Sequence, residues 1–385
     1  MLLSRAFPWS DETGRSGVYV DRKRAGWLLS VGFPLLPVLA VVLHAGTGYE
    51  AWLFLPIVMV YVVVPLLDAL LGEDGSNPPE AVVPALESDP YYRCLPALTV
   101  PLHYLVLAVS VGYAVQAPLS WAGWLALVYS AGLVGGLAVN TGHELGHKRT
   151  LAEQVLTRFA LAIPGYGHFS VEHNFGHHRA VATPDDSASA RFGESIYRFA
   201  VREIPGGFRR ALALQARRLA RQGRSFWSPH NEILQSWLIT LVFQGGLLLM
   251  LGLAALPVLL IHNLVAWWQL TSANYVEHYG LKRESLGNGE YERCRPHHSW
   301  NSNHVMSNLL LFHLERHSDH HAHPQRRYQS LRDFPDLPSL PSGYFGMFLL
   351  AYLPPAWFRI MNPRLLALPH VQGDLERVNR GHQEA

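Results

Sequence analysis

The chain has 385 residues, of which 49% are hydrophobic and only 16% are Asp, Glu, Lys or Arg. That charged share lies well below the roughly 25% of ordinary soluble domains. Its 21 His stand against 2 Cys, so a disulfide scaffold, a four-thiolate iron–sulfur cluster and a Cys-rich zinc site are excluded. The net charge of +2 gives no general attraction to nucleic acid, and the apolar content excludes a disordered chain.

Three long blocks are almost free of charge. Between residues 25 and 72 only Glu50 and Asp68 are charged, and blocks 95–142 and 233–276 hold no charged residue. A helix needs about 20 residues to cross a hydrocarbon layer of about 30 Å, so each block is two spans long, and Gly or Pro interrupts each near its middle. Buried helices of a soluble protein would not show such blocks. The predicted transmembrane helices are residues 25–44, 50–71, 96–116, 120–142, 234–254 and 258–276.

Three hairpins of such helices would return every polar segment to one side of the membrane. All 31 Lys and Arg lie in those segments, and residues 22–24 (Arg-Lys-Arg) directly precede the first span, so that side should be the cytoplasm. No cleavable signal peptide is expected before the first span. We therefore predict an all-α membrane protein of six transmembrane helices with a cytoplasmic histidine-rich catalytic region. Its parts are a cytoplasmic segment 1–24, helices one to four in 25–142, a cytoplasmic helical region 143–232, helices five and six in 233–276 and a cytoplasmic region 277–385.

The last apolar stretch, Gly343 to Phe358, is too short for a seventh span and contains two adjacent prolines. We expect it to form an interfacial or re-entrant helix. The fourth span carries a run of small residues between Ala131 and Ala138, which could bring helices together or leave room for a channel, and packing is the favoured interpretation.

Nine of the 21 His lie in four clusters that follow the predicted spans. Residues i and i+4 of a helix share a face, so His143 with His147, and His173 with His177, can each present two imidazoles to one metal. Adjacent His point about 100° apart on a helix, which suits two neighbouring metals. The clusters are 143–148 (HELGHK), 172–178 (EHNFGHH), 274–281 (NYVEHYGL) and 314–322 (LERHSDHHA).

The number of ligands limits the metal. The segment His143-Glu144-x-x-His147 alone fits a zinc protease, in which two His bind zinc and Glu is the general base. Catalytic zinc uses three protein ligands, which would leave five or six of these His unexplained. Two iron ions with four or five His each would use them all, and open coordination positions would allow O2 to bind.

Together the four clusters resemble the signatures of the integral-membrane alkane 1-monooxygenases, the bacterial alkane hydroxylases. Segments 65–74 (PLLDALLGED) and 326–332 (RRYQSLR) also resemble that family, so the likeness covers nearly the whole chain. Three of the clusters have relatives among membrane desaturases and sterol or acyl hydroxylases. The segment 274–281 is more specific to the alkane hydroxylases.

This resemblance implies six spans in a bacterial inner membrane, a His-ligated di-iron centre, and conversion of an n-alkane and O2 to the 1-alkanol and water. The alternatives are another di-iron membrane oxygenase, such as an acyl-chain hydroxylase, a desaturase or a xylene-type methyl hydroxylase, and the zinc protease. The ligands that the resemblance implies are His143, His147, His173, His177, His178, His278, His317, His320 and His321.

Monooxygenation needs two electrons from outside the chain. The sequence has no nucleotide-binding glycine motif and no Cys pairs, so the electrons must come from a separate carrier or from one fused outside these residues. The resemblance implies that this carrier is rubredoxin, reduced by an NADH-dependent rubredoxin reductase. Between Arg191 and Arg224 nine Arg stand against two Glu, a net charge of +7. This segment could steer an acidic redox protein, or hold anionic lipid headgroups.

Other polar residues near the clusters have weaker assignments. Metal-bound imidazole usually donates its second N–H to a carboxylate or carbonyl, which orients the ring. An alkane has no polar group, so its site should be an apolar channel. Eight further His are expected to pack or form hydrogen bonds: His103 and His262 inside spans, and His168, His297, His298, His304, His313 and His323 near the clusters. Carboxylates that could orient ligands are Glu144, Glu172, Glu277, Asp319, Asp185 and Asp186.

Overall fold

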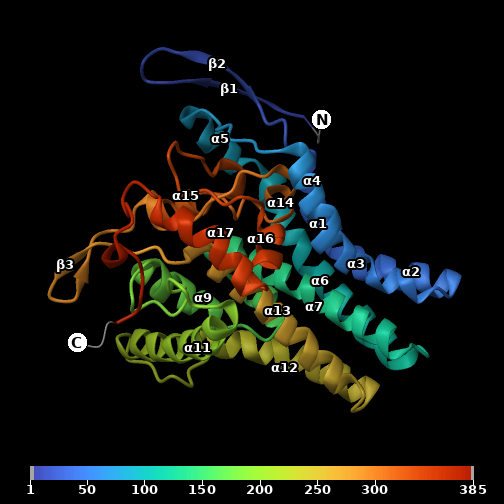
Figure 1. The fold of residues 1–385 in the computed structure, drawn as a ribbon. Helices are drawn as coiled ribbons and strands as arrows, with labels where there is room; N and C mark the ends of the chain where they lie inside the picture. The colour runs from blue at the N-terminus through green and yellow to red at the C-terminus, as the bar shows by residue number, and fades with distance from the viewer. Residues whose placement is uncertain (1–3, 383–385) are drawn as a thin grey trace.

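The computed structural model describes residues 4–382, so the outermost three residues of each predicted terminal segment lie outside it. Long helices form a bundle on one side of Figure 1, and the shorter histidine-bearing helices gather at its other end. The bundle contains α1 (Leu29–Gly32), α2 (Leu36–Thr47), α3 (Leu55–Val58), α4 (Val64–Leu71), α6 (Pro90–Gln116), α7 (Trp121–Gly146), α12 (Glu232–Leu251) and α13 (Ala255–His278).

Among the described residues, five helical stretches are long and apolar enough to cross a membrane. They are 26–47, which includes α1 and α2, 50–71, which includes α3 and α4, and α6, α7 and α12. The predicted sixth span corresponds to α13, which carries His262, Gln269 and Asn274 among its apolar residues and is therefore less hydrophobic. The arrangement as six spans in three hairpins stays a prediction.

The bundle is held by close packing of α7 against α13. A Cβ added to Gly135 would lie 2.7 Å from Nε2 of His262, and one added to Gly136 would lie 2.5 Å from Cβ of Gln269. Real Cβ atoms do not approach so closely, so only glycine lets the two helices come this near. The small residues of the fourth predicted span therefore serve helix packing, as expected.

The second region contains the long helix α11 and several shorter elements, and it covers one end of the bundle. A π-helical turn joins α9 to α10, and α11 runs beside them. Its helices are α5 (Val83–Ser88), α8 (Leu151–Ala162), α9 (Phe169–Glu172), α10 (His178–Ala180), α11 (Ile196–Ala220), α14 (Val305–Leu310), α15 (His317–Ala322), α16 (Tyr344–Ala351) and α17 (Pro354–Leu366).

Two short hairpins correct the all-α prediction. The strands β1 (Ala6–Ser10) and β2 (Ser16–Val20) pair antiparallel, as do β3 (Ser285–Gly287) and β4 (Glu290–Tyr291). The second hairpin turns at Asn288 and Gly289, whose φ angles of 54° and 77° suit the tight turns that join twisted strands. The hairpins lie in the predicted cytoplasmic segments 1–24 and 277–385. Strands of only two to five residues carry too little pattern to be predicted there.

The stretch from Gly343 to Phe358 lies beside the bundle, and its expected role as an interfacial or re-entrant helix stays a prediction. The stretch forms α16 and the start of α17, and five of the eight α16 residues are buried. They pack against α13, which ends at His278. The apolar composition of α16 is therefore explained by its burial inside the protein, next to the histidine clusters.

Candidate metal centre and apolar cavity

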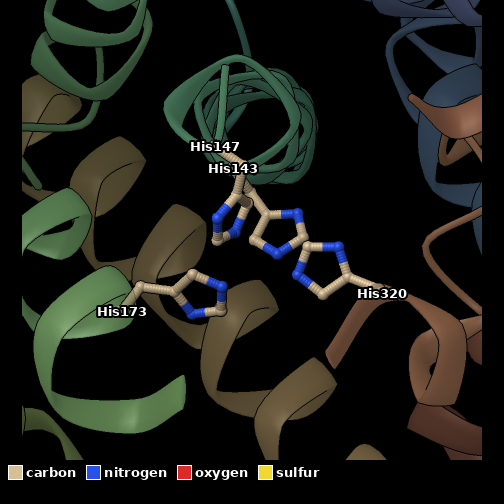
Figure 2. Close-up of side chains that lie close together, drawn as sticks. All are labelled: His143, His147, His173 and His320. Atoms are coloured by element: carbon tan, nitrogen blue, oxygen red, sulfur yellow. The ribbon is translucent and has the colours of Figure 1, made fainter. Parts of the chain in front are cut away.

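Two groups of four His meet where α7 and α13 end. The first group combines His143 of α7 and His147, which follows it, with His173 and His320, and Figure 2 shows these four rings pointing toward one another. Within the group each residue offers one nitrogen, and these nitrogens all lie within 4.8 Å of one another. All but the half-buried His147 are buried. The i, i+4 pair at the end of α7 thus faces one point, as its spacing predicted.

The second group lies beside the first and is fully buried. It combines His177, His278, His317 and His321, again with nitrogens within 4.8 Å of one another. The Nε2 atom of His317 lies 3.2 Å from that of His278 and 3.0 Å from that of His321. His320 and His321 therefore serve different groups, as expected for adjacent His.

One predicted pairing was wrong. His173 and His177 were expected to face one metal, but they belong to different groups. Their rings are stacked, with centroids 5.2 Å apart and ring planes at 24° to each other, so the two rings lie side by side. The backbone here forms a wider π-helical turn rather than an α-helical one, which the spacing alone did not reveal.

His178 lies between the two groups, and its ring centroid is 4.4 Å from that of His321 in the second group. Its Nε2 atom is 3.1 Å from Nε2 of His173 and 3.2 Å from Nε2 of His320. All nine predicted His therefore meet within one small volume, four in each group with His178 between them.

The chemistry of these nitrogens fits metal ions. Nε2 of His143, His147 and His177 is buried without a hydrogen-bond partner, and other Nε2 atoms face each other at about 3 Å. Unpartnered buried polar atoms are costly, and a metal ion would satisfy several at once. Burial lowers the pKa of His147 and His173 well below its usual value. Both rings are thus held in the neutral form that binds metal.

A carboxylate orients one ligand of the second group. Nδ1 of His177 lies 2.9 Å from Oδ2 of Asp186, whose other oxygen accepts from Arg210 Nη2 at 2.5 Å. Burial alone would lower the pKa of His177, but Asp186 outweighs burial and raises it. Arg210 also binds Glu172, so α11 is linked through Arg210 to the metal groups. No sequence pattern distinguishes Arg210 from the other eight arginines between Arg191 and Arg224.

Of the other predicted carboxylates, only Glu277 approaches a ligand. Its Oε2 atom lies 3.4 Å from Nε2 of His317. Glu144 instead pairs with Lys148 at 3.1 Å, which places it poorly for a protease base. Asp319 binds Arg326, and the exposed Asp185 pairs with His382.

An apolar cavity lies directly beside the two groups. His143, His173 and His317 line one part of it, together with Glu277. The remaining walls are mostly aliphatic and aromatic side chains of α7, α13, α16 and the segment before α15. They are Leu133, Leu137, Val139, Phe169, Leu270, Ala273, Leu311, Leu314, Tyr344, Phe345 and Phe348, with Gly136, Asn140, Gln269 and Asn274. The cavity thus runs from the metal groups along α7 into the bundle.

The remaining His are placed differently. His103 and His262 are buried within the bundle as expected. His313 bonds the Tyr328 carbonyl at 2.9 Å. A third, smaller group that the sequence did not predict joins Glu292 with His297 and His298.

Buried Glu203 on α11 gives a stability prediction. It accepts from Thr271 Oγ1 at 2.8 Å and Asn274 Nδ2 at 3.1 Å, and burial raises its pKa from 4.5 to about 7. The unfolded chain loses this proton at lower pH than the folded one, so stability should fall as pH rises from 4.5 to about 7 and then level off. Glu203→Gln should remove that fall, at about 1.4 kcal/mol per pKa unit. Thermal unfolding in detergent between pH 5 and pH 8 measures it, and parallel curves for both proteins would contradict it.

The sequence of this chain is similar to a protein family model and to several known monooxygenases. The sequence model of the fatty acid desaturase family matches residues 119–360, which include all nine His. Alkane 1-monooxygenase 1 of Alcanivorax borkumensis is 55% identical over 361 residues, or 94% of this chain and 89% of the relative. The alkane 1-monooxygenase of Ectopseudomonas oleovorans is 53% identical over the same shares. The xylene/toluene monooxygenase hydroxylase component of Pseudomonas putida is 29% identical over 83% of each chain.

Proposed function

Because this chain belongs to the alkane 1-monooxygenase family, within the wider fatty acid desaturase family, we propose that it hydroxylates the terminal carbon of n-alkanes. The reaction converts alkane, O2, two electrons and two protons to the 1-alkanol and water. The observation that carries this proposal is the apolar cavity that opens onto two groups of buried His.

The nine His would hold two iron ions in this proposal. His143, His147, His173 and His320 would hold one, and His177, His278, His317 and His321 the other, with His178 between the two as the ninth ligand. Bound iron would supply the binding and reduction of O2. Two ions fit the two separate groups better than the single zinc of a protease, since zinc would leave one whole group of nitrogens unsatisfied.

The chain itself positions the alkane and excludes water. An alkane offers no hydrogen bond, so its orientation must come from the shape of the cavity. The aliphatic walls of the cavity would bind the alkane. The end of the cavity near His143 and His317 would hold one terminal carbon of the alkane against the metal-ligating His. Phe345 and Phe348 of α16 cover the cavity together with Tyr344. The burial of α16 therefore serves the site.

The proposed location is the bacterial inner membrane, with six spans and the His groups on the cytoplasmic side. The placement of every Lys and Arg outside the apolar blocks supports that side. Electrons would come from rubredoxin, itself reduced by an NADH-dependent reductase, because the chain holds no carrier motif of its own.

Asp186→Asn tests how the second group is held. Without its carboxylate charge, His177 loses the partner that fixes its ring, and iron affinity should fall by about ten- to a hundredfold. Competitive chelator titration of the purified protein measures the change. Asp185→Asn is the matched control, since this exposed neighbour contacts none of the nine His and should leave affinity unchanged.

The proposed function is tested by product analysis. Purified iron-loaded protein with rubredoxin, its reductase and NADH should convert octane through hexadecane to 1-alkanols. Failure to form any 1-alkanol, together with oxidation of an acyl chain or an aryl methyl group, would show that the substrate class is wrong.

A further inference from the structure

The arginines of α11 divide into two sets. Arg202, Arg210 and Arg218 point inward and pair with carboxylates. The exposed arginines have no carboxylate partner within residues 4–382, and the only acidic residue between the first and last of them is buried Glu203. The exposed set is Arg198, Arg209, Arg217, Arg221 and Arg224. The outer face of α11 therefore carries uncompensated positive charge.

The direction of α11 determines where its exposed arginines lie relative to the apolar bundle. The ring of Phe208 stacks on Trp237 of α12 at 5.9 Å, and Arg218 pairs with Glu232, at the start of α12, at 2.6 Å. Helix α11 thus runs antiparallel to the first part of α12. Its residue Phe208 lies beside the apolar part of α12, and its residue Arg218 lies beside the charged start of α12. Tryptophan is typical of the level at which a helix enters the membrane, so Trp237 marks that level here.

The last three exposed arginines lie at or beyond the charged end of α12. Arg217 and Arg221 follow Phe208 by nine and thirteen residues, which is about 14 and 20 Å of helix. Arg218, the neighbour of Arg217, pairs with Glu232, the first residue of α12, which precedes Trp237 by five residues, or about 8 Å of helix. Arg217, Arg221 and Arg224, the distal arginines, are therefore the exposed arginines that lie farthest from the apolar part of α12.

An exposed tryptophan adjoins the distal arginines. Trp227 follows Arg224 by three residues and is 78% exposed. Trp and Arg are the residues most enriched among those that carry the binding energy of protein interfaces. Their combination on one exposed surface suits a protein partner.

This surface also lies directly behind the metal groups. The guanidinium of Arg218 stands 3.7 Å from the ring centroid of Phe175. Phe175 lies in the π-helical turn between His173 and His177, which supply one nitrogen to each group. A partner bound to the outer face of α11 is thus separated from the His groups by little more than this helix.

We propose that the distal arginines and Trp227 form the docking surface for a small, soluble, acidic one-electron carrier. The inference rests on the proposed function, because alkane hydroxylation consumes two electrons and so oxidises two molecules of reduced carrier per turnover. The opposite charges would steer the carrier to α11 and set its affinity mainly at low ionic strength.

Rubredoxin is the probe for the test, with the full chain loaded with iron and embedded in neutral phosphatidylcholine nanodiscs. Arg217→Glu with Arg221→Glu should raise the Kd and KM for rubredoxin about tenfold or more at low ionic strength, without changing the rate at saturating rubredoxin. The matched control on the same helix, Arg198→Glu with Arg209→Glu, should change both constants far less.

An unchanged rubredoxin Kd in the Arg217→Glu, Arg221→Glu variant would overturn the docking surface. Loss of binding to phosphatidylglycerol vesicles, with unchanged rubredoxin binding, would instead identify the bilayer as the occupant. Because Kd is measured without turnover, it tests the surface even if the wild-type protein forms no 1-alkanol, a result that would count against the proposed function alone.

Discussion

His278→Ala should lose iron and all alkane hydroxylation while the helices stay folded. His278 is fully buried at the end of α13, and its Nε2 atom lies 3.2 Å from that of His317. Removing it leaves only three His in the second group, which should release at least one of two ions. Iron analysis after gel filtration, with circular dichroism for helix content, measures both effects.

The matched control is His370→Ala. His370 lies outside the two groups, near His297, and should keep both its iron content and its turnover. Full iron and turnover in His278→Ala would remove the segment 274–281 from the metal centre.

Leu133→Trp should shorten the range of alkanes that the protein accepts. Leu133 lines the cavity and is 4% exposed, and it precedes His143 by ten residues, or about 15 Å of α7. A larger side chain there fills the end of the cavity farthest from the His groups. Octane should still be hydroxylated, whereas turnover of hexadecane should fall by at least about a hundredfold, as a blocked pocket costs several kcal/mol.

Leu125→Trp is the control on the same helix. Leu125 is 50% exposed on the outside of α7 and does not line the cavity, so this variant should keep the wild-type preference. Equal losses for octane and hexadecane in Leu133→Trp would show that the alkane does not extend along α7.

The sequence could predict much of the fold because a bilayer makes strict demands. Charge-free blocks long enough for two spans indicated the apolar helices, and Glu50–Leu71 matches the predicted 50–71. The end of α7 was equally clear, since His143 and His147 are one helical turn apart. The short β3–β4 hairpin had no comparable signal, because two or three residues carry no recognisable periodicity.

The arrangement of the site depended on features that spacing does not encode. The π-helical turn at 173–177 sends His173 and His177 to different groups, and nothing in the letters distinguishes it from an α-helical turn. Asp185 and Asp186 are equivalent in the sequence, yet only Asp186 is buried against His177. Arg210 of α11, more than twenty residues later in the sequence, donates a hydrogen bond to Asp186 and so stabilises its buried position.

We propose that nine His hold two irons at the mouth of an alkane cavity. The most direct measurement is the metal content of the purified wild-type chain, combined with Mössbauer spectroscopy of protein grown on 57Fe. Two irons per chain, both in nitrogen-rich coordination, is the expected result. One zinc per chain without iron would contradict the claim and return His143, Glu144 and His147 to a hydrolytic reading.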